Sequence, residues 1–354
     1  MLEIKFGSYL PPEFHGDPQQ AAKLPRVRVA LVGTGLWGYE HARAFHANPY
    51  TDLVAICGRN RDKVAARAKE FSAQAYTDLG AMLATEKPDL VSLCLGNLDH
   101  FRPTMQVLEA RIPAFVEKPF VFELDQARTL LAAAEQRKLF FAINFNHRYA
   151  EPFLRAKDYI ERGALGELVF ASWRFGGNHD GPFEHPHCNL IETQCHGIDA
   201  LLNLCGPISH VSAEMTDKTN KGGFGTVALA LRFENAAVGD LLGSYDTSYA
   251  YPDTHRCEVN GTRGRLVVED TSRRLVFNRL DDPVSEVWQA TFFDDEARDF
   301  SRSHDRHVAD MIRCFRSGLP PPIPARQGYE VLRVCQAAIR SFTEGRRIAL
   351  AEVV

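Results

Sequence analysis

The chain has 354 residues, of which 45% are hydrophobic and 24% charged. This composition is typical of an ordinary globular protein, and the length suits two domains or one large one. The formal net charge of −4 and the pI of about 6.4 exclude a strongly basic, nucleic-acid-binding or lipid-binding surface, and no run approaches the ~18 consecutive apolar residues of a membrane span.

The N-terminus carries an early Glu and has no apolar core of signal-peptide length. The eight cysteines are scattered along the chain without a paired CxxC spacing. In a chain of this size they are expected to be reduced and mostly buried, which predicts a cytoplasmic protein.

Residues 1–25, rich in Pro, Gly and Gln, are expected to form an arm that packs on the body or on another subunit. From residue 26 to residue 149, short β-branched strands such as "VRVALVG" alternate with helices of about 10–15 residues. This alternation predicts a parallel sheet with helices on both faces, a Rossmann-type cofactor-binding domain.

The pattern changes in the second domain, residues 150–354. A helix, the strand "ELVFASWRFGG" and a second helix are followed, from about 208 to 292, by short strands joined by Gly, Asn and Asp turns. This succession favours a large, mostly antiparallel, open sheet. Two final helices, about 303–317 and 327–344, are expected to pack partly on the first domain. The predicted fold class is therefore α/β, with an α+β second domain for substrate and oligomerisation.

A GxGxxG sequence follows the first strand directly, in the order Gly33-Thr34-Gly35-Leu36-Trp37-Gly38. The first Gly permits the tight turn, the second lets the backbone approach a pyrophosphate, and the third lets helix and strand pack closely. Because the motif lies between a strand and a helix, it predicts dinucleotide binding rather than a purely structural turn.

The acidic residue that usually binds the adenosine ribose is missing about 20 residues later. That position reads Cys57-Gly58-Arg59-Asn60. Gly58 leaves room for a 2′-phosphate and Arg59 offers it a fork of donors, although Arg59 could instead stack on adenine or point into solvent. The sequence favours NADP(H), with NAD(H) as the alternative.

"FVEKPF" puts Glu117 and Lys118 at the end of a buried strand, where parallel sheets present the ligand crevice. The glycine loop, "GNLDH" (96–100), "EKP" and "NFNHRY" (144–149) occur in order with consistent spacing. Together they resemble the glucose–fructose oxidoreductase/inositol dehydrogenase/rhizopine catabolism (Gfo/Idh/MocA) family over about residues 26–350. The resemblance implies an NAD(P)-dependent oxidoreductase.

The resemblance also implies catalytic roles. The family usually has Asp, three residues and then His; the matching positions are Glu192 and His196, followed by Gly197-Ile198-Asp199. His196 is implied as the base or acid for the substrate hydroxyl, Lys118 as the group that polarises it, and Glu192 as their support. At a spacing of four on a helix, Glu192 and His196 would share one face, so a surface ion pair is the alternative.

Other site residues follow from the same match. Asn97, His100, Glu117 and Arg148 are implied in the cofactor site, although Gly96 replaces the family's frequent Pro there, and Asn97, His100 and Arg148 could instead satisfy backbone carbonyls. Candidate substrate contacts, each of which could instead support the fold, are Trp173, Arg174, His187 and Asn189. No metal is predicted, because the nearby histidines lack fixed ligand spacing and there is no HExxH.

The sequence therefore predicts an NAD(P)-dependent dehydrogenase or reductase acting on a hydroxyl or carbonyl of a sugar, polyol or related carbohydrate. Two alternatives stay open: a glycosidase that oxidises its sugar transiently while keeping NAD bound, and a non-catalytic regulator that senses dinucleotide or sugar. Apolar residues beyond strict alternation in "VALALRF" and "VGDLLGSY" predict a homo-oligomer, dimer or tetramer, joined through the second sheet.

Overall fold

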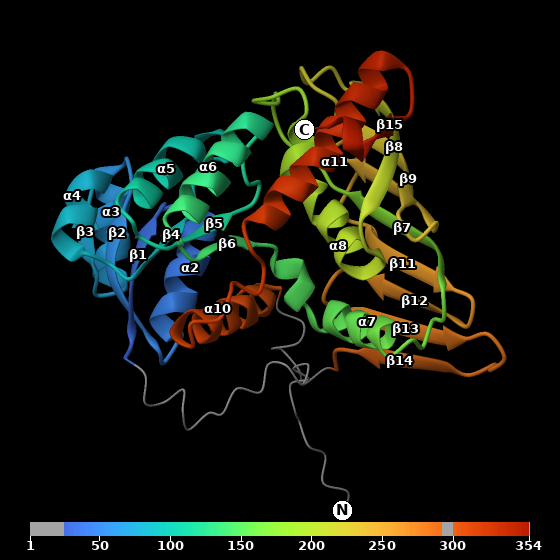
Figure 1. The fold of residues 1–354 in the computed structure, drawn as a ribbon, viewed down its shortest axis with the longest axis horizontal. Helices are drawn as coiled ribbons and strands as arrows, with labels where there is room; N and C mark the ends of the chain where they lie inside the picture. The colour runs from blue at the N-terminus through green and yellow to red at the C-terminus, as the bar shows by residue number, and fades with distance from the viewer. Residues whose placement is uncertain (1–24, 292–299, 354) are drawn as a thin grey trace, which may run out of the picture.

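The computed structural model describes residues 25–291 and 300–353. The predicted arm, residues 1–25, lies outside these ranges except for its last residue. Figure 1 shows two domains, each built on its own sheet, with helices between them. In the described ranges, no helix has the length and apolar character needed to cross a bilayer.

The first sheet has six parallel strands, in the order β3-β2-β1-β4-β5-β6. The strands are β1 (Val27–Val32), β2 (Thr51–Cys57), β3 (Gln74–Tyr76), β4 (Leu90–Leu93), β5 (Ala114–Glu117) and β6 (Phe141–Asn144). The helices that connect them are α2 (Leu36–Ala47), α3 (Arg61–Glu70), α4 (Leu79–Glu86), α5 (Phe101–Glu109) and α6 (Leu124–Gln136). The strand order reverses between β1 and β4, which places the ligand crevice at the carboxyl ends of these strands. The predicted Rossmann domain is confirmed.

The second sheet has nine strands, in the order β14-β13-β12-β11-β7-β10-β9-β8-β15, and only β7 and β10 pair in parallel. They are β7 (Leu168–Gly176), β8 (Ile208–Thr216), β9 (Thr226–Phe233), β10 (Val238–Ser244), β11 (His255–Gly261), β12 (Gly264–Glu269), β13 (Arg274–Arg279), β14 (Ser285–Gln289) and β15 (Ile348–Ala349). The prediction of a mostly antiparallel sheet is confirmed.

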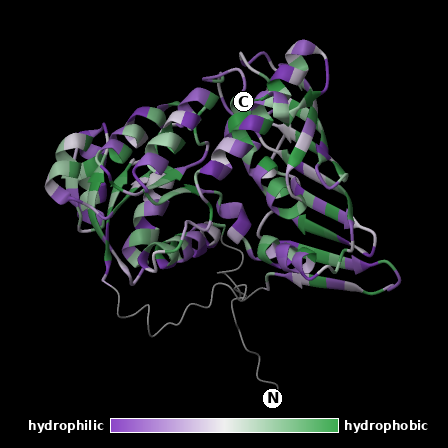
Figure 2. Ribbon diagram, in the orientation of Figure 1, coloured by the Kyte–Doolittle hydropathy of each residue, from purple (hydrophilic) through white to green (hydrophobic). Residues whose placement is uncertain are grey.

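The helices of the described residues cover the inner face of this sheet, the one turned toward the first domain (Figure 1). They are α7 (Glu151–Glu161), α8 (Cys195–Cys205) and α11 (Arg326–Glu344). Along β9 buried and exposed side chains alternate, with Val227, Leu229 and Leu231 turned inward. Figure 2 shows the same mixture of hydrophobic and hydrophilic residues along the strands. The outer face is left open by the described residues.

The last helices tie the two domains together. α10 (Ser301–Arg316) packs on α2 and β6 of the first domain. Before α11, the Ala325 N–H donates to the Phe141 carbonyl (2.9 Å), and the Ile143 N–H donates to the Ile323 carbonyl (3.1 Å). The C-terminal helices thus pack on the cofactor domain.

Candidate active site

The glycine loop fits its predicted use at the end of β1. Gly33 has φ of +129°, and a Cβ there would lie 1.8 Å from the Cys94 carbonyl oxygen. A Cβ on Gly38 would lie 2.6 Å from the Gly33 carbonyl oxygen. A Cβ on Gly35, by contrast, would meet nothing within 4 Å. Side chains are therefore excluded where the loop packs, while the start of α2 opens onto free space that suits a pyrophosphate.

The Arg59 segment lies beside this loop. A Cβ on Gly58 would lie 3.1 Å from side-chain atoms of Thr34 and Val64, so the position has little room for a larger residue. The Arg59 side chain is 89% exposed, and its guanidinium lies 3.1 Å from the Asp99 carboxylate. Arg59 can thus move toward a ligand, but the Asp99 carboxylate would compete with that ligand for the guanidinium.

The Glu117 carboxylate is buried at the end of β5 and accepts hydrogen bonds from three groups. The donors are His41 Nε2 (2.8 Å), the Lys118 backbone N–H (3.0 Å) and the Asn144 side-chain amide. Burial raises the pKa of Glu117, but the hydrogen bond and charge of His41, the charge of Lys118 and the Asn144 amide outweigh it, so the pKa is lowered overall. An ionised Glu117 therefore anchors the backbone from which Lys118 projects.

His100 supports the same turn from the other side. Its ring is buried, with Nδ1 2.7 Å from the Pro119 carbonyl oxygen and Nε2 3.3 Å from the Leu95 carbonyl oxygen. Burial lowers its pKa. Both nitrogens thus face backbone carbonyls, and the N–H of the neutral ring can donate to one of them, which favours the alternative that His100 positions the loop. Asn97, in the short helix η2 (Asn97–Asp99), stays half-buried beside it.

Lys118 reaches across the domain boundary to the segment that precedes His196. Lys118 Nζ donates a hydrogen bond to the Glu192 carbonyl oxygen (3.3 Å). Glu192 belongs to a π-helical turn, η4 (Asn189–Thr193), and His196 is the second residue of α8. Burial lowers the pKa of His196 well below its ordinary value, and the charge of nearby Lys118 lowers it further. His196 is therefore a neutral base close to an ammonium group.

The expected support of His196 by the Glu192 carboxylate stays a prediction. The π-helical turn η4 ends at Thr193, and Gln194 caps α8, so the two residues lie on successive helical segments. Among the described contacts, no hydrogen bond or ion pair joins them. The Glu192 charge contributes instead to raising the pKa values of Cys188 and Tyr245, which are raised mainly by burial.

The His196 ring stacks on one histidine that the sequence did not single out, and that histidine contacts a second. His147, from η3 (Asn146–Tyr149), stacks on it with ring centroids 3.9 Å apart, and His255 of β11 meets His147 edge-on at 5.3 Å. His147 lies inside the quoted "NFNHRY", so its place beside Arg148 was a usable signal. Nothing in the sequence marked His255.

Arg148 forms an ion pair with a buried carboxylate. Its guanidinium donates two hydrogen bonds to the buried Asp199 carboxylate of α8, one of them of 2.7 Å. Arg148 thereby fastens η3, which carries His147, to the helix that carries His196. Its predicted place beside the site is compatible with this arrangement. The contact that the structure shows for Arg148 supports these two helical segments.

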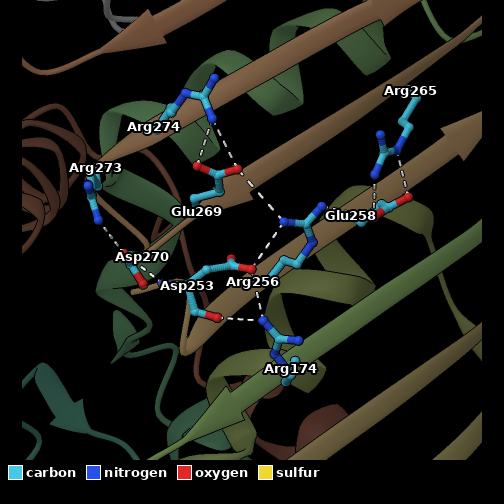
Figure 3. Close-up of polar contacts among 9 residues, drawn as sticks. All are labelled: Arg174, Asp253, Arg256, Glu258, Arg265, Glu269, Asp270, Arg273 and Arg274. Carbon is cyan, nitrogen blue, oxygen red and sulfur yellow. Dashed lines mark hydrogen bonds and ion pairs between the residues drawn. The ribbon is translucent and has the colours of Figure 1, made fainter. Parts of the chain in front are cut away.

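Trp173 and Arg174 are neighbours on β7 and so face opposite sides of the sheet. Trp173 is fully buried beneath α8, where its indole N–H donates to the Gln194 side chain (3.3 Å). Arg174 projects from the outer face, 2.9 Å from Asp253, within the charged network of Figure 3. The prediction of Arg174 as a substrate contact is therefore corrected, because the sheet separates it from His196.

His187 and Asn189 hold the segment before α8. Asn189 is buried, and its amide donates to the Gly225 (2.8 Å) and Gly243 (3.2 Å) carbonyls, which fixes the π-helical turn on the sheet. The half-buried His187 stacks on Phe224 with centroids 5.1 Å apart. Burial lowers its pKa to about 4. Asn189 therefore supports the fold, while His187 stays a candidate contact.

One group of three metal-type side chains occurs within the described residues: His41, Glu117 and His304. His41 bonds to Ser92 Oγ (2.8 Å) as well as to Glu117, and the Asn144 amide bridges Glu117 and His304 Nδ1 (3.1 Å). These contacts describe a hydrogen-bonded cluster beneath Lys118. The prediction of no metal stays a prediction.

Two family models cover most of the chain. One described as "Oxidoreductase family, NAD-binding Rossmann fold" matches residues 27–145, and one described as "Oxidoreductase family, C-terminal alpha/beta domain" matches residues 153–350.

Similar proteins include the D-glucoside 3-dehydrogenase of Escherichia coli, 26% identical, over 92% of this chain and 97% of that protein. The myo-inositol 2-dehydrogenase of Thermotoga maritima is 22% identical, over 93% of this chain and all of that protein. Among solved structures, levoglucosan dehydrogenase in complex with NADH and L-sorbose superposes with a TM-score of 0.84 at 17% identity, over 92% of this chain and 99% of that one.

Proposed function

The chain belongs to the Gfo/Idh/MocA oxidoreductase family, and we propose that it transfers hydride between a nicotinamide cofactor and a hydroxyl or carbonyl of a sugar, polyol or related carbohydrate. The similar proteins that carry names of this kind support that substrate class. The observation that carries the proposal is the hydrogen bond from Lys118, at the end of the cofactor sheet, to the Glu192 carbonyl, which brings its charge near His196.

The site supplies what oxidation of a carbinol needs. The nicotinamide, when bound, accepts or gives the hydride. His196 takes the hydroxyl proton as hydride leaves, which a neutral imidazole can do at pH 7. The Lys118 ammonium hydrogen-bonds the same oxygen and stabilises its developing negative charge. In the reverse direction the protonated His196 returns the proton to the carbonyl oxygen.

Glu192 has a different place in the proposal. Its backbone carbonyl holds Lys118, and its half-buried carboxylate is not bonded to His196. We therefore propose that the carboxylate binds a substrate hydroxyl beside Tyr245, whose pKa it helps to raise. This uses the additional methylene that distinguishes Glu from the family's usual Asp.

A screen of sugars and polyols with NAD⁺ and NADP⁺, read at the absorbance band of the reduced nicotinamide, tests the function. We expect reduction of one cofactor by at least one member of the panel. Cleavage of glycosides without net cofactor reduction would identify the redox-neutral glycosidase instead. Tight cofactor binding with neither reaction would support the sensor and contradict the proposal.

We propose further that the cofactor is NADP(H) in preference to NAD(H). No carboxylate follows β2 at the ribose position, and Arg59 is exposed next to the glycine loop. Asn60 caps α3 by accepting a hydrogen bond from the Lys63 N–H (2.9 Å), so helix amides also face this region. A 2′-phosphate would replace Asp99 as the partner of Arg59.

The outer face of the second sheet is proposed as the contact between subunits of a dimer or tetramer. Its middle strands expose Phe170, Val238 and Leu242, which are 41%, 49% and 44% exposed. Beside them runs the ion-pair network of Figure 3, on β7, β11, β12 and β13. An apolar strip next to ordered charges fits a self-complementary interface better than a solvated surface.

The proposed compartment is the cytoplasm. All eight cysteines are buried free thiols in the structure. Burial raises the pKa of all eight, for example of Cys57 and Cys188 to about 11 and of Cys195 to about 12. Such thiols are structural and suit a reducing environment.

A further inference from the structure

A buried polar cluster surrounds the residue that precedes Lys118. Asn144, the last residue of β6, is directly paired with Glu117 of β5, and its side-chain amide donates to the Glu117 carboxylate. The same amide nitrogen lies 3.1 Å from His304 Nδ1, and the amide oxygen lies 2.7 Å from His307 Nδ1. Asn144 and both histidines of α10 are buried. Both ends of one amide therefore join β5 to α10.

The donors and acceptors of this cluster follow from the chemistry of its groups. An ionised carboxylate only accepts hydrogen bonds, so the nitrogen end of the Asn144 amide faces Glu117 and the oxygen end faces His307. His304 Nδ1 faces the NH₂ group, so it accepts, and this ring carries its proton on Nε2. His307 Nδ1 faces the amide oxygen, so it donates. Asn144 thus fixes opposite tautomers in two histidines of one helix.

The two rings are otherwise held by packing. His307 stacks on Tyr149 with centroids 4.6 Å apart, and His304 packs on the His41 ring at 4.3 Å. Burial lowers the pKa of His304 well below its ordinary value and that of His307 to about 3, so both rings are neutral at pH 7. Each leaves its buried Nε2 atom without a partner among the residues that the structure describes. Because an unpaired buried nitrogen is unfavourable, the contribution of these rings lies in their bonds to Asn144.

The Glu117 carboxylate connects this cluster to Lys118. One of its oxygens, Oε1, is held between the Asn144 amide and His41 Nε2, which lies 2.8 Å away. The other oxygen, Oε2, accepts the Lys118 N–H (3.0 Å). Holding Oε1 therefore holds the peptide from which the Lys118 side chain extends to the Glu192 carbonyl.

We propose that Asn144 is a positioning residue for Lys118, which it holds in place by joining the Glu117 carboxylate to His304 and His307 of α10. The proposal rests on the proposed function only in treating Lys118 as the group that polarises the substrate. A displacement of about 1 Å at a reacting group costs roughly 100-fold in rate, so a small movement of this peptide is measurable.

Imidazole ¹⁵N NMR of the full-length protein at pH 8 tests the cluster without an enzyme assay. We expect His307 to carry its proton on Nδ1 and His304 on Nε2, with signals assigned from His304→Gln and His307→Gln. In Asn144→Leu, which keeps the size of the side chain and removes its hydrogen bonds, His307 should lose the Nδ1 proton. A His307 ring protonated on Nε2 in the wild type overturns the proposal, and this outcome does not depend on a folded Asn144→Leu protein.

A methyl label on Lys118 separates this proposal from the proposed function. After reductive ¹³C-methylation, which keeps the charge of the amine, the Lys118 signal, assigned with Lys118→Arg, should shift in Asn144→Leu. Ser303→Ala is the matched control, because it removes a different bond of α10, the one from the Asn146 amide (2.9 Å). A signal unchanged in Asn144→Leu, or shifted equally in both variants, overturns the proposal even if sugars are oxidised. A shift confined to Asn144→Leu supports it even if no sugar reacts.

Kinetics measure the consequence for the reaction. Asn144→Leu should lower kcat roughly tenfold to a hundredfold, with KM little changed, and Ser303→Ala should leave kcat unchanged. In the Lys118→Ala background, Asn144→Leu should have no further effect on the residual rate, because Asn144 acts through Lys118. An unchanged kcat in Asn144→Leu, or losses that multiply in the double variant, overturns the proposal.

Discussion

In the proposed reaction, His196 accepts the proton that leaves the substrate hydroxyl. Replacement of His196 by Ala should lower kcat by roughly 10²–10⁴ and leave cofactor affinity nearly unchanged. Lys118→Ala should cost a comparable factor and also weaken cofactor binding, because Lys118 lies at the carboxyl end of β5 beside both ligand sites. Steady-state kinetics with fluorescence titration of the cofactor measures both.

Two variants make this comparison specific. Glu192→Gln should raise KM without moving the acid limb, since the carboxylate is not bonded to His196. Lys69→Ala, in the last turn of α3, should change neither constant. Full activity in His196→Ala would refute its assignment as the base.

The proposed preference for NADP(H) also rests on one residue, Arg59. We expect wild type to bind NADP(H) more tightly than NAD(H), and Arg59→Ala to lose about 1–3 kcal/mol of that preference with its charge-assisted hydrogen bond. Calorimetric titration with both cofactors measures the ratio, and Arg67→Ala, at the other end of α3, serves as the control. A wild-type preference for NAD(H), or a ratio unaffected by Arg59→Ala, would contradict the idea.

The motif residues were predictable because the strands that they follow can be identified from the neighbouring sequence. The glycine loop and Lys118 follow strands whose ends must meet in a parallel sheet. Arg174 was mispredicted because neighbouring strand residues face opposite ways, and the sequence does not show which face is inner. His255 reaches the site only through β11, paired with β7, and a long-range pairing of this kind leaves no local pattern.

At the scale of elements, α8 depends on Gly197 for its distance from β7. A Cβ on Gly197 would lie 2.3 Å from the Trp173 indole nitrogen. Gly197→Ala should therefore push α8 and His196 outward, lowering the free energy of unfolding by about 1–3 kcal/mol and lowering kcat.

Urea unfolding and activity assays of Gly197→Ala test this expectation. Gly80→Ala in α4 is the control, since its Cβ meets only the ends of the Gln106 and Asp78 side chains at 3.2–3.3 Å and Ala favours the helix. A Gly197→Ala protein as stable and active as wild type would show that α8 is not held by this contact.

Glu258 on β11 ties neighbouring strands together on the outer face (Figure 3). Hydrogen bonds from Arg265 (2.7 and 2.9 Å) lower its pKa from 4.5 to about 2 despite partial burial. Because the folded-state pKa is depressed, this stabilisation is present above pH 4.5 and is lost as the pH falls toward 2.

Glu258→Gln should accordingly lower the unfolding free energy by about 1–2 kcal/mol at pH 7, after allowance for solvent screening of Arg265, and by much less near pH 2.5. Thermal unfolding at fixed protein concentration measures the difference, with Glu109→Gln at the exposed end of α5 as control. An equal loss at both pH values would contradict the ionic origin.

The alternation of helices and strands was predictable in both domains, and the final helices agree within about two residues at each end. The division between η4 and α8 was not predictable from the sequence. A π-helical turn keeps the apolar spacing of a helix, although it rotates the residues that precede it. Asn189 and Gln194 hold this turn through buried hydrogen bonds (3.0 Å between their side chains).

At the scale of the whole molecule, the open outer face of the second sheet predicts the state of assembly. We expect light scattering at micromolar concentration to give a dimer or tetramer of the 39.7 kDa chain. Phe170→Asp combined with Leu242→Asp, which charges the apolar strip, should shift the particle toward the monomer. Leu319→Asp, equally exposed after α10 (47%), should not. A wild-type monomer would rule the interface out.

The central claim, direct hydride transfer in this crevice, is tested by the fate of one hydrogen. A substrate from the screen, deuterated at the reacting carbinol carbon, is incubated with oxidised cofactor, and the reduced nicotinamide is analysed by mass spectrometry. The proposed chemistry predicts one deuterium in each reduced cofactor, with the yield abolished in His196→Ala over the same time. Reduced cofactor that carries no deuterium would contradict it.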